Sequence, residues 1–365
     1  MANVDAPDSD SPISSALSME DHPTPEPDSV VSTLRALSES PDLTDPALEA
    51  RLYHAKLSAY IPRDRKDQTV RILQSFIDHL PPGGKRIVVK FVVSNGDDKL
   101  HELATHLKTA VLIPFRARGG KTPQVTESPF SDTDINRDDV ASEMTESSSR
   151  KDQQPLKWLC LKRDGYRCVV TGIWDDHAEQ RCPPGQRGTH IGETELAHII
   201  PFSMGKWEDA DEEKAIAQSW ETIYLLFPDV YSVLKPSDVN SAENALTLLS
   251  PLHRNFGNLK IAFIPTDREN TYKIKTHSRF SSYLFQQMPP PNEDGDRLVT
   301  FNQHANYELP SRVLLATHAA IAEILHASGQ GEQIEELLHD WDAIRCLASD
   351  GSTDLQSLLS LVHVH

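Results

Sequence analysis

Two stretches decide the fold of this chain: ETELAHIIP at residues 193–201 and AENALTLLSPLHRNFG at residues 242–257. The first is short, largely apolar and ended by Pro201, and it predicts a β-strand. The second continues from an apolar run into a helix that we expect at about 250–257. A strand, a connecting loop and a helix in this order can bring side chains from all three to one small site.

Three polar residues stand within this apolar frame: His198, Asn244 and His253. A histidine has a near-neutral pKa, so it can act as a general base, and its neutral imidazole can bind a divalent metal. An asparagine can tie a loop through hydrogen bonds between its side chain and the backbone. The three residues are therefore the candidate catalytic set, with Asn244 and His253 nine positions apart.

The upstream stretch RDGYRCVVTG at residues 163–172 completes a pattern. We expect its residues 166–172 to form a short strand that runs into a turn. Together the three stretches resemble the HNH endonuclease superfamily, and they look most similar to the HNH-domain proteins of filamentous fungi. The resemblance covers roughly residues 155–265.

The resemblance implies an α+β fold, with a ββα-metal (HNH) finger flanked by helical N- and C-terminal segments. It also implies metal-dependent hydrolysis of phosphodiester bonds, with DNA favoured over RNA as the substrate. His198 would be the general base, His253 would bind one divalent metal ion (Mg²⁺ or similar), and Asn244 would orient the loop that places His198.

The chain departs from the family pattern at the expected metal ligands. Ala197 stands where many members have a ligand, and Gly257 stands where many have a further ligand or acid. Glu195 lies two residues before Ala197, hence on the same face of a strand, and it is our candidate for the second metal ligand. The alternative function is therefore a catalytically degenerate HNH-fold module that serves in binding or as a scaffold.

A structural zinc ion is not expected. Many family members brace the finger with two Cys-x-x-Cys pairs, but here the first is reduced to CVVT at residues 168–171 and no cysteine lies near His253. His177 and His190 share a loop with Cys182, but their irregular spacing does not favour a metal site there.

Farther out, composition divides the chain into regions. We expect a disordered acidic tail at 1–45, a helical region at 46–115 and a disordered linker at 116–150. The HNH domain would occupy 155–270, and 271–365 would form an extension with two helices, at 310–326 and 331–348, packing on that domain. The run IVVKFVV at 87–93 is compatible with a strand or with a short buried helix.

The charge balance bears on partners. The chain of 365 residues has a net charge of −18, from 36 basic and 54 acidic side chains. More than half of this excess lies in the first 50 residues, whereas 51–115 are net basic. Overall acidity argues against a generic nucleic-acid binder but not against a local site. The chain has no apolar run of membrane-spanning length, so no membrane partner is expected. We expect a soluble intracellular protein; the sequence separates neither nucleus from cytoplasm nor one oligomeric state from another.

Overall fold

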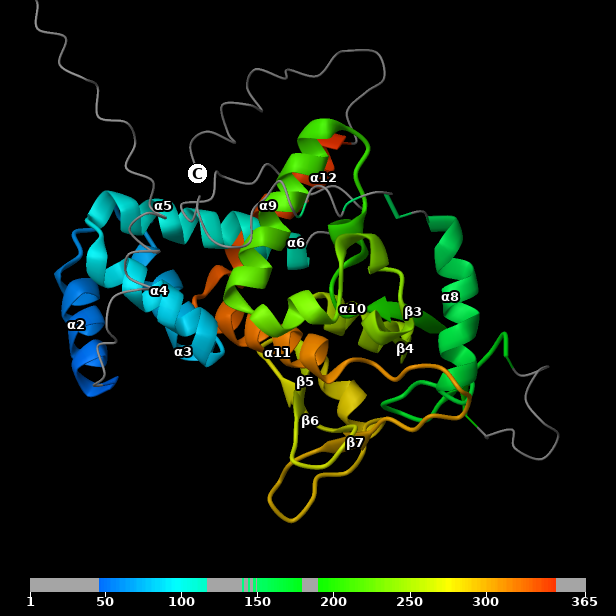
Figure 1. Ribbon diagram of the computed structural model, residues 1–365. Coiled ribbons are helices and arrows are strands. Elements are labelled where there is room, and N and C mark those ends of the chain that lie inside the picture. Colours follow the sequence, from blue (N-terminus) through cyan, green and yellow to red (C-terminus); the bar gives the residue numbers. More distant parts are fainter. Residues whose placement is uncertain are drawn as a thin grey trace, which may run out of the picture.

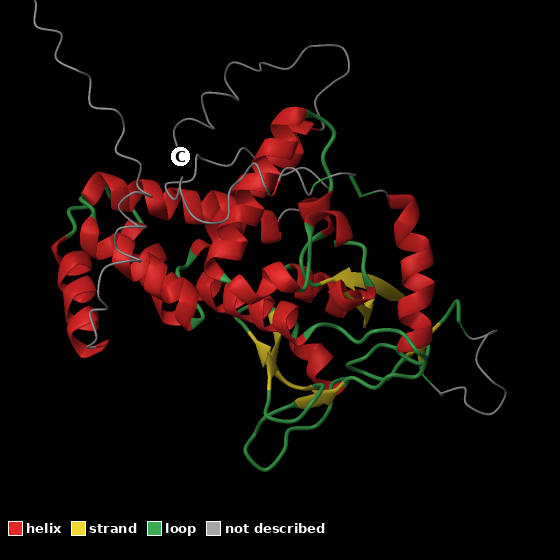
Figure 2. Cartoon of the chain, viewed as in Figure 1, coloured by secondary structure: helices red, strands yellow, loops and turns green. Residues whose placement is uncertain are grey.

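The computed structural model describes residues 46–116, 140, 144, 147–148, 150–178 and 190–345. Helices make up most of these residues, and the strands form three small sheets, as Figure 1 and Figure 2 show. This is the α+β architecture expected from the sequence. The expected tail at 1–45 and most of the expected linker at 116–150 lie outside the described residues.

The N-terminal described region is helical throughout. Its elements are α2 (Pro46–Ala59), α3 (Thr69–His79), α4 (Pro82–Ser94), α5 (Asp97–Leu107), a π-helical turn (Lys108–Leu112) and α6 (Ile113–Arg116). The run at 87–93, open between strand and helix, is helical. Pro82 occupies the first turn of α4, and Val88, Phe91 and Val92 are buried. Burial on one helical face thus overrides the strand propensity of the β-branched residues.

Helix α4 approaches α9 (Ala210–Leu226) very closely at Gly84. A Cβ atom at this position would lie only 2.0 Å from the backbone oxygen of Leu226. The backbone oxygen cannot move aside as a side chain can. Glycine is therefore required for the two helices to pack at this distance.

The centre of the predicted finger is a pair of antiparallel strands followed by a helix; the connection between the strands contains α9, and the strand pair is called the hairpin below. Strands β3 (Thr194–His198) and β4 (Ala245–Leu249) are antiparallel, and α10 (Ser250–Gly257) follows β4 directly. Their register pairs His198 with Ala245. Leu196 and Ala245 pack with residues of α8 (Arg150–Arg163), whereas Glu195 faces α10. The hairpin thus lies between α8 and α10.

The expected strand at 166–172 is wrong. The chain forms only an isolated bridge between Arg167 and Trp174 there, and the strands nearby are the two-residue β1 (Trp174–Asp175) and β2 (Ile191–Gly192), which pair in parallel. Gly165, Tyr166 and Gly172 all have positive φ. The backbone turns at both ends of the segment, which leaves no extended run long enough for a strand.

The remaining elements complete a shared core. Strands β5 (Ile261–Pro265), β6 (Thr271–Thr276) and β7 (Leu298–Thr300) form an antiparallel sheet, and α11 (Arg312–Ala327) and α12 (Gln330–Arg345) follow it. Helix α11 packs against both α3 and β5. One hydrophobic cluster runs through the N-terminal helices, α9, the hairpin, α10, this sheet and α11.

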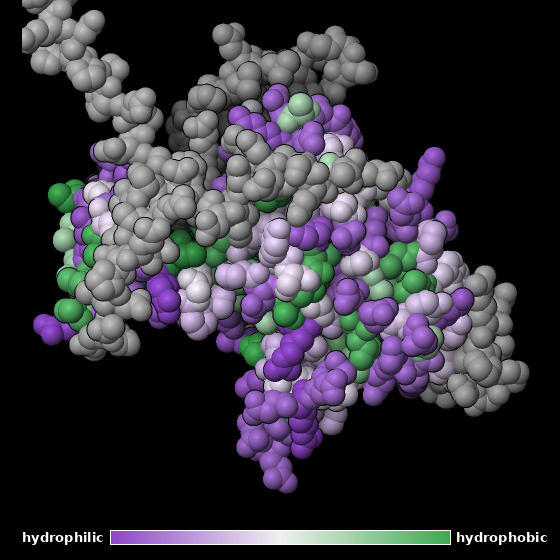
Figure 3. All heavy atoms as spheres, viewed as in Figure 1, coloured by the Kyte–Doolittle hydropathy of each residue, from purple (hydrophilic) through white to green (hydrophobic). Residues whose placement is uncertain are grey.

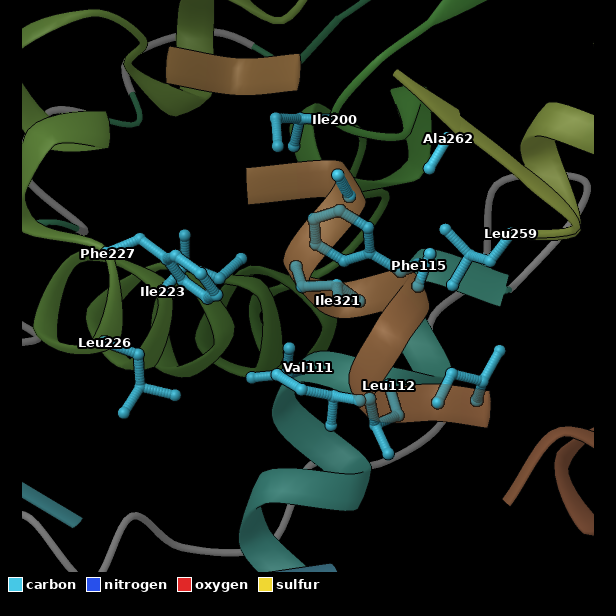
Figure 4. Packing of buried hydrophobic residues seen from close by; sticks show 14 of the residues in the cluster. Val111, Leu112, Phe115, Ile200, Ile223, Leu226, Phe227, Leu259, Ala262 and Ile321 are labelled. Atoms are coloured by element: carbon cyan, nitrogen blue, oxygen red, sulfur yellow. The ribbon is translucent and has the colours of Figure 1, made fainter. Parts of the chain in front are cut away.

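The core reaches the loop after β3. Figure 4 shows Phe115, Ile200 and Ile321 near one another, although they come from α6, that loop and α11. All three are buried. Ile200 follows His198 by two residues, so its burial anchors the chain beside that histidine.

Hydrophilic side chains gather over the end of the molecule formed by β5–β7 and their loops, as Figure 3 shows. Within the described part of the chain, no helix combines the length and apolar character needed to cross a membrane.

Candidate active site

Asn244 clasps two segments of backbone beside the hairpin. Its side chain is fully buried. The amide oxygen accepts from the backbone N–H of Ile200 (2.8 Å), and the amide nitrogen donates to the carbonyls of Ile200 (3.0 Å) and Val239 (2.9 Å). Both ends of this amide are therefore occupied in holding the loop after His198 against the segment before β4.

His198 is the last residue of β3, and its imidazole is held by a partner that sequence analysis did not single out. Its Nε2 lies 3.0 Å from Oδ1 of Asn240. The ring of Phe202 lies near one side, with 5.7 Å between ring centroids. Burial lowers the pKa of His198 to about 4, against the opposing effect of the Asn240 hydrogen bond and with a further lowering by the charge of His253. The imidazole is consequently neutral at pH 7, the form that can accept a proton.

Glu195 and His253 form a direct pair across the face between β3 and α10. Nδ1 of His253 contacts Oε2 of Glu195, and the Ser250 hydroxyl donates to Oε1 at 3.0 Å. Burial alone would raise the pKa of Glu195. The hydrogen bond and charge of His253, the bond from Ser250 and the charge of Lys157 outweigh burial and hold that pKa below its usual value. Glu195 is thus a carboxylate at neutral pH.

The C-terminal end of α10 is fastened by side chains from distant elements. Arg116 of α6 donates to the carbonyl of Asn258 at 2.8 Å. Two histidines of α11 contact neighbouring carbonyls. Nε2 of His318 lies 3.3 Å from the carbonyl oxygen of Phe256, and Nε2 of His326 lies 2.9 Å from that of Leu259. The carbonyls of Asn258 and Leu259 follow the last residue of α10, and that of Phe256 also accepts from the backbone N–H of Leu259 at 2.8 Å. The helix that carries His253 is therefore fixed at both ends, by the hairpin and by these donors.

The Glu195–His253 pair has the chemistry of a divalent-metal site. One carboxylate oxygen and one imidazole nitrogen are donors that first-row divalent ions accept, and half-exposed side chains leave room for water or phosphate as further ligands. Ala197 is buried and offers no donor, and Gly257 has no side chain. The residues present thus fit a metal held by two protein ligands.

A second group of potential ligands lies at β1. The ligand atoms of Asp175, Asp176 and His177 lie within 4.8 Å of one another, and among the described residues no other trio does so. Asp175 is buried and accepts from the Thr194 hydroxyl and from the backbone N–H of Ala178. Those bonds give Asp175 a structural task, because they join β1 to the start of β3.

The cysteines take no part in either group. Cys160 and Cys168 are buried free thiols. Burial raises the pKa of Cys160 to about 12, which keeps it a thiol. Cys182 and Cys346 lie outside the described residues.

Residues 168–264 match a protein-family model described as HNH endonuclease. The matched segment contains β3, β4 and α10, and with them Glu195, His198, Asn244 and His253. No curated protein and no solved structure shows a significant match. The resemblance seen in the sequence is thereby confirmed at the level of the HNH superfamily.

Proposed function

We propose that this chain, which carries an HNH endonuclease domain at residues 168–264, is a metal-dependent nuclease that hydrolyses phosphodiester bonds in DNA. The observation that carries the proposal is the pairing of two features at the hairpin. His198 is a neutral imidazole at the end of β3, and the Glu195–His253 pair beside it supplies an anionic oxygen and a nitrogen donor.

In the proposed reaction His198 acts as the general base. Its unprotonated nitrogen accepts a proton from a water molecule, whose oxygen then forms a bond to phosphorus while the bond from phosphorus to the leaving oxygen breaks. The leaving oxygen takes a proton from solvent. Asn244 keeps the loop beside His198 in place through its three backbone hydrogen bonds.

Glu195 and His253 are the residues that would hold the metal. A divalent cation bound there supplies positive charge to the scissile phosphate and to the leaving oxygen. The carboxylate oxygen of Glu195 and the imidazole nitrogen of His253 would be the two protein ligands, and their chemistry would determine which metal ions bind. Mixed oxygen and nitrogen donors suit Mn²⁺, Ni²⁺ or Zn²⁺ at least as well as Mg²⁺.

The second candidate is a catalytically inactive module that uses the same fold for binding. Two observations favour it. Ala197 and Gly257 stand at positions where many family members have a metal ligand, and the trio of potential ligands found among the described residues is Asp175, Asp176 and His177, away from the Glu195–His253 pair. The two candidates differ in one measurable property, which is cleavage.

Nicking of supercoiled plasmid by the full chain separates them. We expect conversion to open circles with at least one of Mg²⁺, Mn²⁺, Ni²⁺ or Zn²⁺, and none in EDTA. His198→Ala should abolish cleavage, and His253→Ala should raise the metal concentration needed for half-maximal cleavage.

Two histidine variants serve as controls. His54→Ala removes an exposed histidine on α2 and should leave cleavage unchanged. His177→Ala should also leave it unchanged, whereas a loss would move the metal site to the Asp175 group. A folded wild-type protein that cleaves with none of the metals would replace the nuclease proposal with the binding module.

A further inference from the structure

The contact between His198 and Asn240 determines which nitrogen of the imidazole carries the proton. An amide oxygen can only accept a hydrogen bond. Because Oδ1 of Asn240 lies 3.0 Å from Nε2, that nitrogen must be the protonated one, and Nδ1 has the lone pair. Among the described residues, no hydrogen-bond partner meets Nδ1, and this atom is not one of the buried unpartnered atoms. Nδ1 is therefore the ring nitrogen that can accept a proton.

Asn240 is itself held in place by the clasp around Asn244. Its neighbour Val239 is buried and supplies the carbonyl to which the Asn244 amide donates. The same amide holds Ile200, two residues beyond His198. One buried side chain thus fixes the segments on which both members of the His198–Asn240 pair lie, although they are 42 positions apart.

We propose that Asn240 is the positioning residue of the active site: it locks His198 in the tautomer with Nε2 protonated and directs Nδ1 toward the attacking water. This rests on the proposed function, in which His198 is the base. When Nδ1 takes the proton, the ring becomes a cation, and its Nε2–H donates a stronger, charge-assisted bond to Oδ1. Asn240 therefore favours the protonated product of the base step.

The pKa of His198 is consistent with this role. Burial lowers it, and the Asn240 hydrogen bond is the influence that raises it again. Among the described residues, the uncharged ring of Phe202 lies near the imidazole, and the charge of His253 lowers the pKa of His198 in the same direction as burial.

The test measures the protonation state of the His198 imidazole directly. In full-length protein labelled with ¹⁵N-histidine, a long-range ¹H–¹⁵N spectrum reports which ring nitrogen is protonated, and His198→Ala identifies the signal. In the wild type we expect Nε2–H at pH 7. Asn240→Ala should mix the tautomers and lower the pKa of His198. Asn240→Asp, whose oxygens accept and whose charge favours the imidazolium, should keep the tautomer and raise that pKa.

Plasmid nicking across pH supplies the second readout. Asn240→Ala should slow cleavage by about 10-fold or more, the size of effect that loss of a hydrogen-bond partner has on metal-ligating histidines. Asn240→Asp should restore most of the rate and move the acidic limb of the profile to higher pH. Ser241→Ala is the matched control, because it alters the adjacent residue, whose buried hydroxyl has no partner among the described residues. It should change neither readout.

The outcomes separate the two proposals. If the wild type cleaves but Asn240→Ala changes neither spectrum nor rate, the role of Asn240 is overturned and the nuclease stands. If His198 of the wild type is instead protonated at Nδ1, the role of Asn240 is likewise overturned and the nuclease proposal stands. If the folded wild type fails to cleave with every metal tested, the nuclease proposal is overturned. The positioning role of Asn240 is then overturned with it, even if the spectrum shows the His198–Asn240 hydrogen bond.

Discussion

Asn244 shows how much of this site depends on one side chain. Among the described residues, no hydrogen bond joins it to Glu195 or His253, yet its amide bonds three backbone groups in the interior. In a buried setting, each of these groups would otherwise be left without a partner. Its contribution is therefore to the position of His198 and Asn240 and not to the reaction itself.

Replacing Asn244 with Ala should destabilise the protein and slow cleavage together. The backbone groups of Ile200 and Val239 would lose their partners, at a cost of roughly 3 kcal/mol or more in the free energy of unfolding. Urea unfolding of the two proteins measures this. Asn302→Ala is the control, because Asn302 is exposed and makes one long bond, 3.3 Å, to the carbonyl of Thr300. A loss for Asn244→Ala no larger than for the control would contradict the clasp.

At the scale of elements, local sequence patterns predict individual strands and helices, whereas contacts between distant segments depend on the tertiary fold. Strand β3 and helix α10 were expected from local sequence, β3 from a largely apolar run before Pro201 and α10 from the segment that follows the apolar run at 245–249. The strand itself ends at His198, three residues before that proline. The role of Asn240 could not be read in the same way, because it depends on a bond between loops 42 residues apart. The Glu195–His253 contact was anticipated only as a shared site, since it requires the register of β3 against β4.

The same contrast explains the one wrong prediction and the one open alternative in secondary structure. The stretch at 166–172 has β-branched residues, but its length and direction are set by three residues with positive φ. Non-glycine residues adopt a positive φ rarely, so the turn at Tyr166 could not be predicted from the residue type. The run at 87–93 became helical because α9 and the neighbouring helices bury one face of it, and periodicity over seven residues cannot reveal such a neighbour.

The adjacent glycines at the start of α4 should respond oppositely to alanine. A Cβ at Gly83 would meet the nearest atom of Pro228 at 3.5 Å, an ordinary contact, whereas at Gly84 it would meet the Leu226 oxygen at 2.0 Å. Gly83→Ala should stabilise by up to about 1 kcal/mol through helix propensity. Gly84→Ala should destabilise by about 1–3 kcal/mol because α4 and α9 must separate. Thermal unfolding of both variants checks this, and equal shifts would refute the close approach.

Across the whole molecule, the buried His318 and the half-buried His277 give stability a defined dependence on pH. Burial lowers the pKa of His318 to about 3, and burial with the charge of His326 lowers that of His277 to about 4. Both are near 6.5 in the unfolded chain. Below that pH the unfolded state binds more protons than the native state, so acidification favours unfolding.

The free energy of unfolding should therefore be nearly constant between about pH 7 and pH 8 and should fall steadily from pH 6.5 toward pH 4. His318 alone contributes roughly 2 kcal/mol of this loss between pH 7.5 and pH 5. Urea unfolding at several pH values measures the slope. His318→Gln, which cannot be protonated, should be less stable at pH 7.5 but show a shallower slope, and the exposed His54→Gln should leave the slope unchanged. Parallel slopes for His318→Gln and wild type would rule out this origin.

The single hydrophobic cluster has a consequence for how such a chain can change in evolution. Residues 168–264 carry the family pattern, but α9 within them packs on α4 and on the π-helical turn, and α10 is held by Arg116, His318 and His326 from outside. A gene rearrangement that carried this segment alone into another protein would leave those contact surfaces unmatched. The structural unit is thus the hairpin together with both helical flanks, and a substitution in a flank is tolerated only as far as the packing against it allows.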